Sequence, residues 1–193
     1  MKTKTLLLLL LAFLVICSLP QTAVAQAVEA TVKSQPDAPL QITRAACSSV
    51  EGKGFSCKAS VQIPQTGRWT AFGLKWKLTL EDGKTTTFYE WGDASLRPGP
   101  YPGSFAPGEL LERRDAGGFG MLGAAKQPSI SSAEVELEFA MPAVGQTWGD
   151  TKSKNYSRLM SLRSGQDLAM NYLRSIYKKE GAEGVLKALG VVK

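Results

Sequence analysis

Nine residues near the middle of the chain alternate strictly between apolar and other side chains, and this pattern constrains the fold most. Apolar side chains occupy every second position of residues 72–80. A helix would spread them around its circumference, whereas a β-strand places them on one face. Asp82-Gly83 favours a tight turn, and residues 84–91 are rich in threonine and aromatic side chains that favour strands. The sequence therefore predicts a β-hairpin, in which a two-residue loop would place Trp76 opposite Tyr89.

The same alternation recurs before and after this hairpin. It is present in residues 40–43, 58–63 and 134–141, and residues 110–114 predict a further short strand. Helical spacing appears only after all of these segments, so a parallel βαβ topology is not expected. Many short strands with alternating faces favour a mainly β fold, which we predict to be an antiparallel immunoglobulin-like β-sandwich followed by a C-terminal α-helix.

The periodicity changes near residue 150. One helix face then recurs at alternating spacings of three and four, at Leu159, Leu162, Gln166, Ala169, Leu173 and Ile176, and Gln166 interrupts its apolar stripe. This spacing predicts an amphipathic helix over residues 153–179, packed on the sandwich. Gly181 should end it, with a second short helix over residues 182–189. Asp167 follows Arg163 by four residues, which favours an ion pair along the helix.

The first 25 residues have the pattern of a secretory signal peptide. Lys2 and Lys4 precede an apolar run over residues 6–16, and a small-x-small site predicts cleavage after Ala25. The apolar run is too short for a membrane anchor, which needs about 20 residues. We therefore expect a secreted or periplasmic protein without a transmembrane anchor. Lipidation at Cys17 is a weaker alternative, because the residue before it is not small.

The rest of the chain divides by composition. Residues 26–39 are small and polar and predict a flexible leader. Residues 40–150 would form the sandwich, including a loop over residues 92–128 that is crowded with glycine and proline. Residues 151–193 would form the helical segment. The length is that of one domain with a sizeable core.

Cys47 and Cys57 are the two cysteines that follow the predicted signal peptide. In an exported chain such a pair predicts a disulfide, here across a hairpin. A redox role is the alternative, but the spacing is much longer than in a Cys-x-x-Cys motif.

The chain contains no histidine, and this excludes several classes of chemistry. Serine and cysteine triads, the usual zinc sites of hydrolases and histidine acid–base catalysis all depend on that residue. Residues 118–123 match G-x-G-x-x-G, but no strand precedes them and Pro128 prevents a helix after them, so a nucleotide site is not expected. We predict no cofactor, no metal and no catalytic residue. The net charge of +6 is mixed with acidic residues, which does not favour nucleic-acid binding.

A non-catalytic binding or interaction module is therefore the leading interpretation, with a protein, a glycan or an anionic envelope component as partner. Two tryptophans precede Gly-Asp at strand ends, one aromatic residue lies in the glycine-rich loop, and an arginine pair contributes positive charge. These candidate contact residues are Trp91, Trp148, Phe119, Arg113 and Arg114.

Two alternatives remain open. Glu134, Glu136 and Glu138 share one strand face at spacings of about 7 Å, which suits a carboxylate-dependent enzyme acting on polysaccharide. A row of glutamates is also typical of a solvated strand face. The second alternative is a structural or assembly-assisting envelope protein.

Three short motifs carry a family resemblance over roughly residues 40–180. They are Asp82-Gly83, Pro107-Gly108-Glu109 and Thr147-Trp148-Gly149-Asp150. With them the chain resembles a type of secreted bacterial protein that has an immunoglobulin-like sandwich followed by a helix. The resemblance implies that fold and an envelope location, and it implies no activity or catalytic residues.

Overall fold

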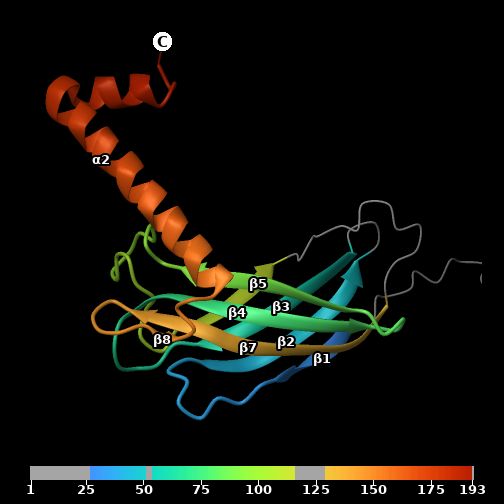
Figure 1. Cartoon of the computed structure of the whole chain (residues 1–193). Helices are drawn as coiled ribbons and strands as arrows, with labels where there is room; N and C mark the ends of the chain where they lie inside the picture. Colours follow the sequence, from blue (N-terminus) through green and yellow to red (C-terminus); the bar gives the residue numbers. More distant parts are fainter. Residues whose placement is uncertain (1–26, 51–53, 116–128, 193) are drawn as a thin grey trace, which may run out of the picture.

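The computed structural model describes residues 27–50, 54–115 and 129–192 and shows a mainly β protein with one C-terminal helix (Figure 1). The elements are β1 (Ala27–Val32), β2 (Gln41–Val50), β3 (Gly54–Gln62), β4 (Trp69–Leu80), β5 (Thr85–Asp93), β6 (Leu110–Asp115), β7 (Ile130–Pro142), β8 (Trp148–Gly149) and α2 (Lys154–Ala188). The predicted signal peptide, Cys17 and the glycine-rich motif at residues 118–123 lie outside the described residues.

One mixed sheet forms the domain and curls into an open half-barrel around the core. Its strand order is β5-β4-β7-β1-β2-β3-β6, and β8 pairs with β7. One half of the sheet consists of β5, β4 and β7, and the other consists of β2, β3 and β6; β1 joins them. The two halves face each other across the core, where the rings of Phe55 on β3 and Phe88 on β5 lie 5.4 Å apart between centroids. The purely antiparallel arrangement that we predicted is wrong, because β1 and β7 run parallel, with Ala30 opposite Ala133.

The predicted flexible leader is also wrong for residues 27–32, which form β1. This strand pairs with β2 through residues 27–29 and with β7 through residues 30–32. Val28, Ala30 and Val32 pack against the core. The segment forms a strand because its alternate apolar side chains are buried against the core while its backbone pairs with both halves of the sheet.

The central hairpin forms as predicted, but its register differs by one residue. Trp76 lies opposite Phe88 instead of Tyr89. The Gly83 amide donates to the Leu80 carbonyl, and Gly83 has a φ of 79°. This is a longer turn that ends in a left-handed glycine. Its extra residue sends Phe88 into the core, where its ring stacks on Trp76 with 5.8 Å between centroids.

The predicted disulfide between Cys47 and Cys57 is confirmed. The two residues lie directly opposite each other on β2 and β3, and both are buried. The bridge therefore joins neighbouring strands across a hairpin, which is the structural role expected from its spacing.

A register shift between β7 and β4 turns apolar side chains of β7 to the outer face of the sheet, where the helix packs. Leu137 faces Leu74, whereas two residues later Phe139 faces Gly73. An extra residue in one strand reverses the alternation. Leu137 therefore belongs to the main core, and Phe139 turns to the outer face, where it is buried with Ala71. The predicted single apolar face of residues 135–141 is thus wrong beyond Leu137.

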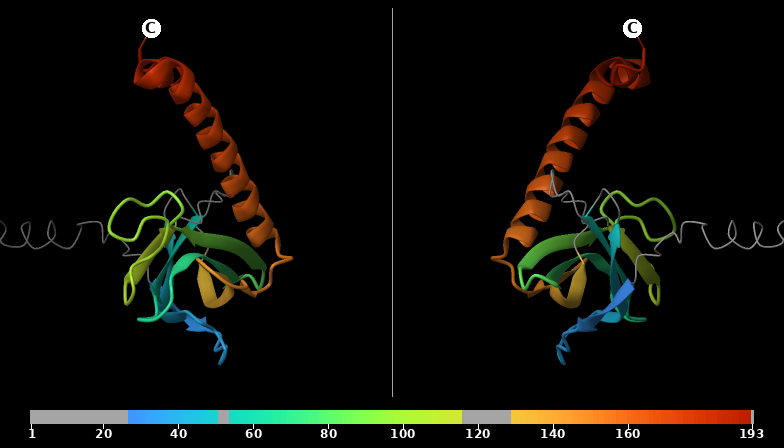
Figure 2. Two further views of the ribbon diagram at one scale, coloured as in Figure 1. Left: turned by 90° about the vertical axis from the view of Figure 1, so that its left-hand side faces the viewer. Right: turned by 90° about the vertical axis from the view of Figure 1, so that its right-hand side faces the viewer.

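Helix α2 starts on this outer face and then leaves the domain (Figures 1 and 2). Ser153 caps its N-terminus by accepting from the Tyr156 amide at 3.1 Å. Gly181, with a φ of 69°, interrupts it where the sequence predicted a break, and a short second helical segment follows. The predicted packing on the sheet holds only for the first turns of the helix.

Candidate functional site

The base of α2 is anchored by a small apolar cluster on the outer face. Leu159 is fully buried and packs with Ala71 and Phe139. The Tyr156 ring meets the Phe139 ring edge to face, with 5.3 Å between centroids. A Cβ atom on Gly73 would collide with the Phe139 ring, so the glycine allows the close approach.

Two polar contacts fix the helix further. The buried Asn155 side chain donates to the Glu90 carbonyl at 3.2 Å. Arg163 makes an ion pair with Asp93, at 2.8 Å between Nη2 and Oδ1, and donates to the Thr70 carbonyl at 3.1 Å. The predicted partnership of Arg163 with Asp167 is therefore wrong, because the guanidinium turns towards the sheet and pairs with a carboxylate there.

Burial and hydrogen bonding at the base shift two pKa values in opposite directions. Burial raises the pKa of Asp93, but hydrogen bonds from Arg163 and Ser95 outweigh it and hold the pKa below its usual range. Burial raises the pKa of Glu138 above its ordinary value, although the nearby Asn155 side chain favours the charged form. Glu138 Oε2 and Asn155 Oδ1 are both buried, and neither atom has a hydrogen-bond partner among the described residues.

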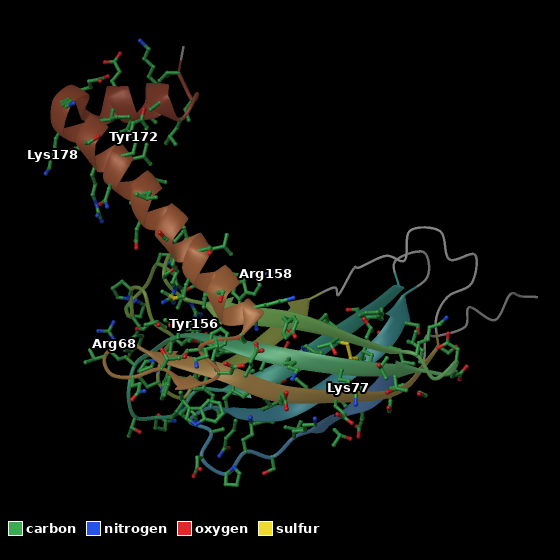
Figure 3. The ribbon with its side chains drawn as sticks, in the orientation of Figure 1. Arg68, Lys77, Tyr156, Arg158, Tyr172 and Lys178 are labelled. Carbon is green, nitrogen blue, oxygen red and sulfur yellow. A yellow bond between two sulfur atoms is a disulfide. The ribbon has the colours of Figure 1, made fainter. Side chains whose placement is uncertain are left out.

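From this base the helix runs away from the sheet, and we call residues 162–178 the helical arm (Figure 1). Its first turns still reach the domain through Arg163, which pairs with Asp93, and through Gln166, which accepts a hydrogen bond from Ser95 Oγ at 3.3 Å. It carries large apolar side chains in water: Leu162 is 50% exposed, Leu168 69%, Met170 41%, Tyr172 63% and Tyr177 61%. Figure 3 shows Tyr172 and Lys178 far from the sheet, with Tyr156 at the base. Single exposed apolar residues are common, but a run of this length is not.

The apolar side chains cover more than one face of the arm. At 100° per residue, Leu168, Tyr172, Ile176, Ala169, Leu162, Leu173, Tyr177 and Met170 span roughly 200° of the circumference. Gly165 and Gln166 also lie within this span, and the remaining arc carries Arg163, Ser164, Asp167, Asn171, Arg174, Ser175 and Lys178. A helix lying on one flat surface needs an apolar stripe of only about 100°. The three-and-four spacing revealed part of this arc, but Leu168, Met170, Tyr172 and Tyr177 fall outside that pattern.

The predicted contact residues do not gather at one place. Trp91 is half-buried beside the Phe139 cluster on the outer face, whereas Trp148 packs against the main core. The two tryptophans therefore belong to different clusters and do not form a common stacking platform. Arg113 and Arg114 lie on β6, opposite Ala59 and Lys58; their side chains, like Phe119, lie outside the described part of the chain.

The glutamate row on β7 is engaged by lysines. Glu134 Oε2 lies 3.2 Å from Lys33 Nζ, and Glu136 Oε1 lies 2.9 Å from Lys75 Nζ. Glu138, the extra residue at the register shift, lies instead at the helix base beside Asn155. The three carboxylates therefore do not form a matched pair around an open cleft, which is what glycoside hydrolysis requires. Within the described residues, no cluster of acidic or cysteine side chains could hold a metal ion.

No protein-family model matches this chain, and neither a curated protein nor a solved structure gives a significant match. Among the described residues, no helix has both the length and the apolar character needed to cross a lipid bilayer.

Proposed function

We propose that this chain is an exported, non-catalytic binding module whose sheet domain holds the helical arm for insertion into a groove of a partner protein. The observation that most supports this proposal is the wide apolar surface of the arm, which no other part of the described chain covers. A helix that is apolar over more than half its circumference is suited to enclosure by a partner.

The location in the proposal rests on two observations. The pattern of residues 1–25 is that of a secretory signal peptide, and the Cys47–Cys57 disulfide is consistent with an oxidising compartment. The immunoglobulin-like assignment belongs to the same proposal. The two facing halves around one core support it, and the parallel pairing of β1 with β7 departs from it.

The proposal is tested with two triple variants of the arm. Leu168→Ser, Tyr172→Ser and Tyr177→Ser together remove the three most exposed apolar side chains of the arm. Asn171→Ser, Arg174→Ser and Lys178→Ser change the polar arc to the same degree. The partner is isolated by chemical crosslinking to the unaltered protein in its native envelope fraction, and its affinity for each variant is then measured.

We expect the apolar variant to lose about 100- to 10,000-fold in affinity. Each of the three side chains contributes about 1–2 kcal/mol when its exposed part is buried. The polar variant should bind within a few-fold of the unaltered protein. Equal binding by both variants would refute the arm as the binding element. Light scattering of the purified protein should give the monomer mass, and arm-dependent dimers would favour the assembly-assisting alternative instead.

A further inference from the structure

The strands β1 and β2 separate and open a cleft on the domain, independently of the helical arm. Their ladder runs from Ala27, opposite Ser48, to Glu29, opposite Ala46, and then ends. From residue 30 onwards β1 pairs with β7 on its other side. The cleft has a volume of about 510 Å³ and lies between the end of β1, the following loop and the start of β2.

A bulge in β2 accounts for the separation. Ile42 lies opposite Val61 on β3, whereas Arg44 lies opposite Ser60, so Thr43 is an extra residue. Such a bulge bends its strand. The start of β2 therefore stays paired with β3 on one side while it turns away from β1 on the other.

The lining of the cleft is apolar at the floor and neutral at the rim. Leu40 and Leu137 are buried at the floor, with Val32 and Ile42 half-buried beside them. Gln35 and Gln41 contribute uncharged polar groups at the rim. Among the described residues, Lys33 is the one charged residue that lines the cleft, and its Nζ atom lies 3.2 Å from Glu134 Oε2. Because this ion pair already neutralises the lysine, the cleft does not favour an anionic ligand.

The open backbone edge of β2 decides which ligand fits. Over residues 41–45 this strand is held in extended form by β3, and within the described residues its other edge makes no ladder pair. Five residues of strand extend about 16 Å. An unpaired strand edge of this kind is a template for another strand, and its hydrogen bonds supply affinity that does not depend on sequence.

We propose that this cleft binds an extended polypeptide segment that adds as a strand to the open edge of β2. Every second side chain of the bound segment enters the cavity above Leu40 and Leu137, and these side chains are apolar. The alternate side chains point to solvent. This site lies apart from the helical arm, and the proposal holds whether or not the arm binds a partner.

The test uses an acetylated and amidated hexapeptide of alternating threonine and valine, titrated into the whole protein and followed by NMR. Two control peptides carry N-methyl groups, one on every threonine and the other on every valine. Because alternate residues of a strand point their amides to opposite edges, one control should lose at least tenfold in affinity while the other binds as before. Binding should slow amide exchange in residues 30–34 and 41–45.

Ile42→Trp should fill the cavity and abolish binding, and Leu96→Trp, at an exposed loop residue outside the cleft, should not. If thermal unfolding shows that Ile42→Trp does not fold, Gln41→Trp at the exposed rim replaces it. The proposal is overturned if the peptide does not bind at about 1 mM. Equal binding of both N-methylated peptides, equal binding by Ile42→Trp, or protection confined to α2 would overturn it as well.

Discussion

Replacing Glu138 by glutamine should stabilise the protein at neutral pH. Its Oε2 atom and Asn155 Oδ1 are both buried acceptors, and the described part of the chain supplies no donor to either. A glutamine amide supplies the missing N–H group, and it also removes the charge that burial disfavours. A new hydrogen bond between unpaired groups contributes about 1 kcal/mol. This value is the middle of the range of roughly 0.5–1.5 kcal/mol for a neutral hydrogen bond.

The pH dependence follows from the raised pKa of Glu138. The folded state favours the protonated carboxyl, so its contribution to stability is present below the ordinary glutamate pKa and is lost as the pH rises through the raised value. Glutamine mimics the protonated form at every pH. The gain of Glu138→Gln should therefore be about 1 kcal/mol at pH 7 and vanish at acidic pH.

Urea unfolding followed by tryptophan fluorescence measures this difference across the pH range. Glu134→Gln is the matched control on the same strand. It removes the ion pair with Lys33, which is partly exposed, and should cost less than about 1 kcal/mol. If Glu138→Gln gives no gain at pH 7, or a gain that does not change with pH, our description of the helix base is wrong.

Three further predictions concern the anchoring of the sheet and the helix. Leu159→Ala should cost about 2–5 kcal/mol in helix docking, read from amide exchange in α2, whereas Met160→Ala at the exposed neighbouring position should cost less than about 1 kcal/mol; equal effects would contradict the anchoring. Asp93→Asn should cost about 1–3 kcal/mol at neutral pH in urea unfolding. Because the pKa of Asp93 is lowered, this cost should disappear as the pH falls through that value, and a pH-independent cost would refute the pairing with Arg163. Reducing the disulfide should lower the free energy of unfolding by about 3 kcal/mol, measured with and without reductant, and an unchanged value would show that the bridge adds nothing.

Local sequence patterns predicted most of the strands, the C-terminal helix and the break within it. The alternation of residues 72–80 predicted the core face of β4, and Gly181 predicted the break in α2. The hairpin register was wrong by one residue because Asp82-Gly83 fits turns of more than one length. The outward turn of Phe139 depends on an irregular register between β4 and β7, and no pattern within β7 reveals its partner.

The sites depended on tertiary structure that the sequence did not indicate. The three-and-four spacing of α2 predicted an apolar stripe but not that the stripe continues beyond the edge of the sheet. Residues 27–32 are too short and too small to be distinguished from a polar leader, and only their position between β7 and β2 makes them a strand. The cleft between β1 and β2 results from that position and from the bulge at Thr43.

Site-specific photo-crosslinking along the arm tests the central claim most directly. A photoreactive residue replaces Tyr172 on the apolar arc in one variant and its neighbour Asn171 on the polar arc in another, and each is illuminated in the native envelope fraction. We predict a discrete crosslinked partner protein from position 172, with little product from position 171. Equal crosslinking from both positions, or none from position 172, would contradict the claim that a partner encloses the apolar surface of the arm.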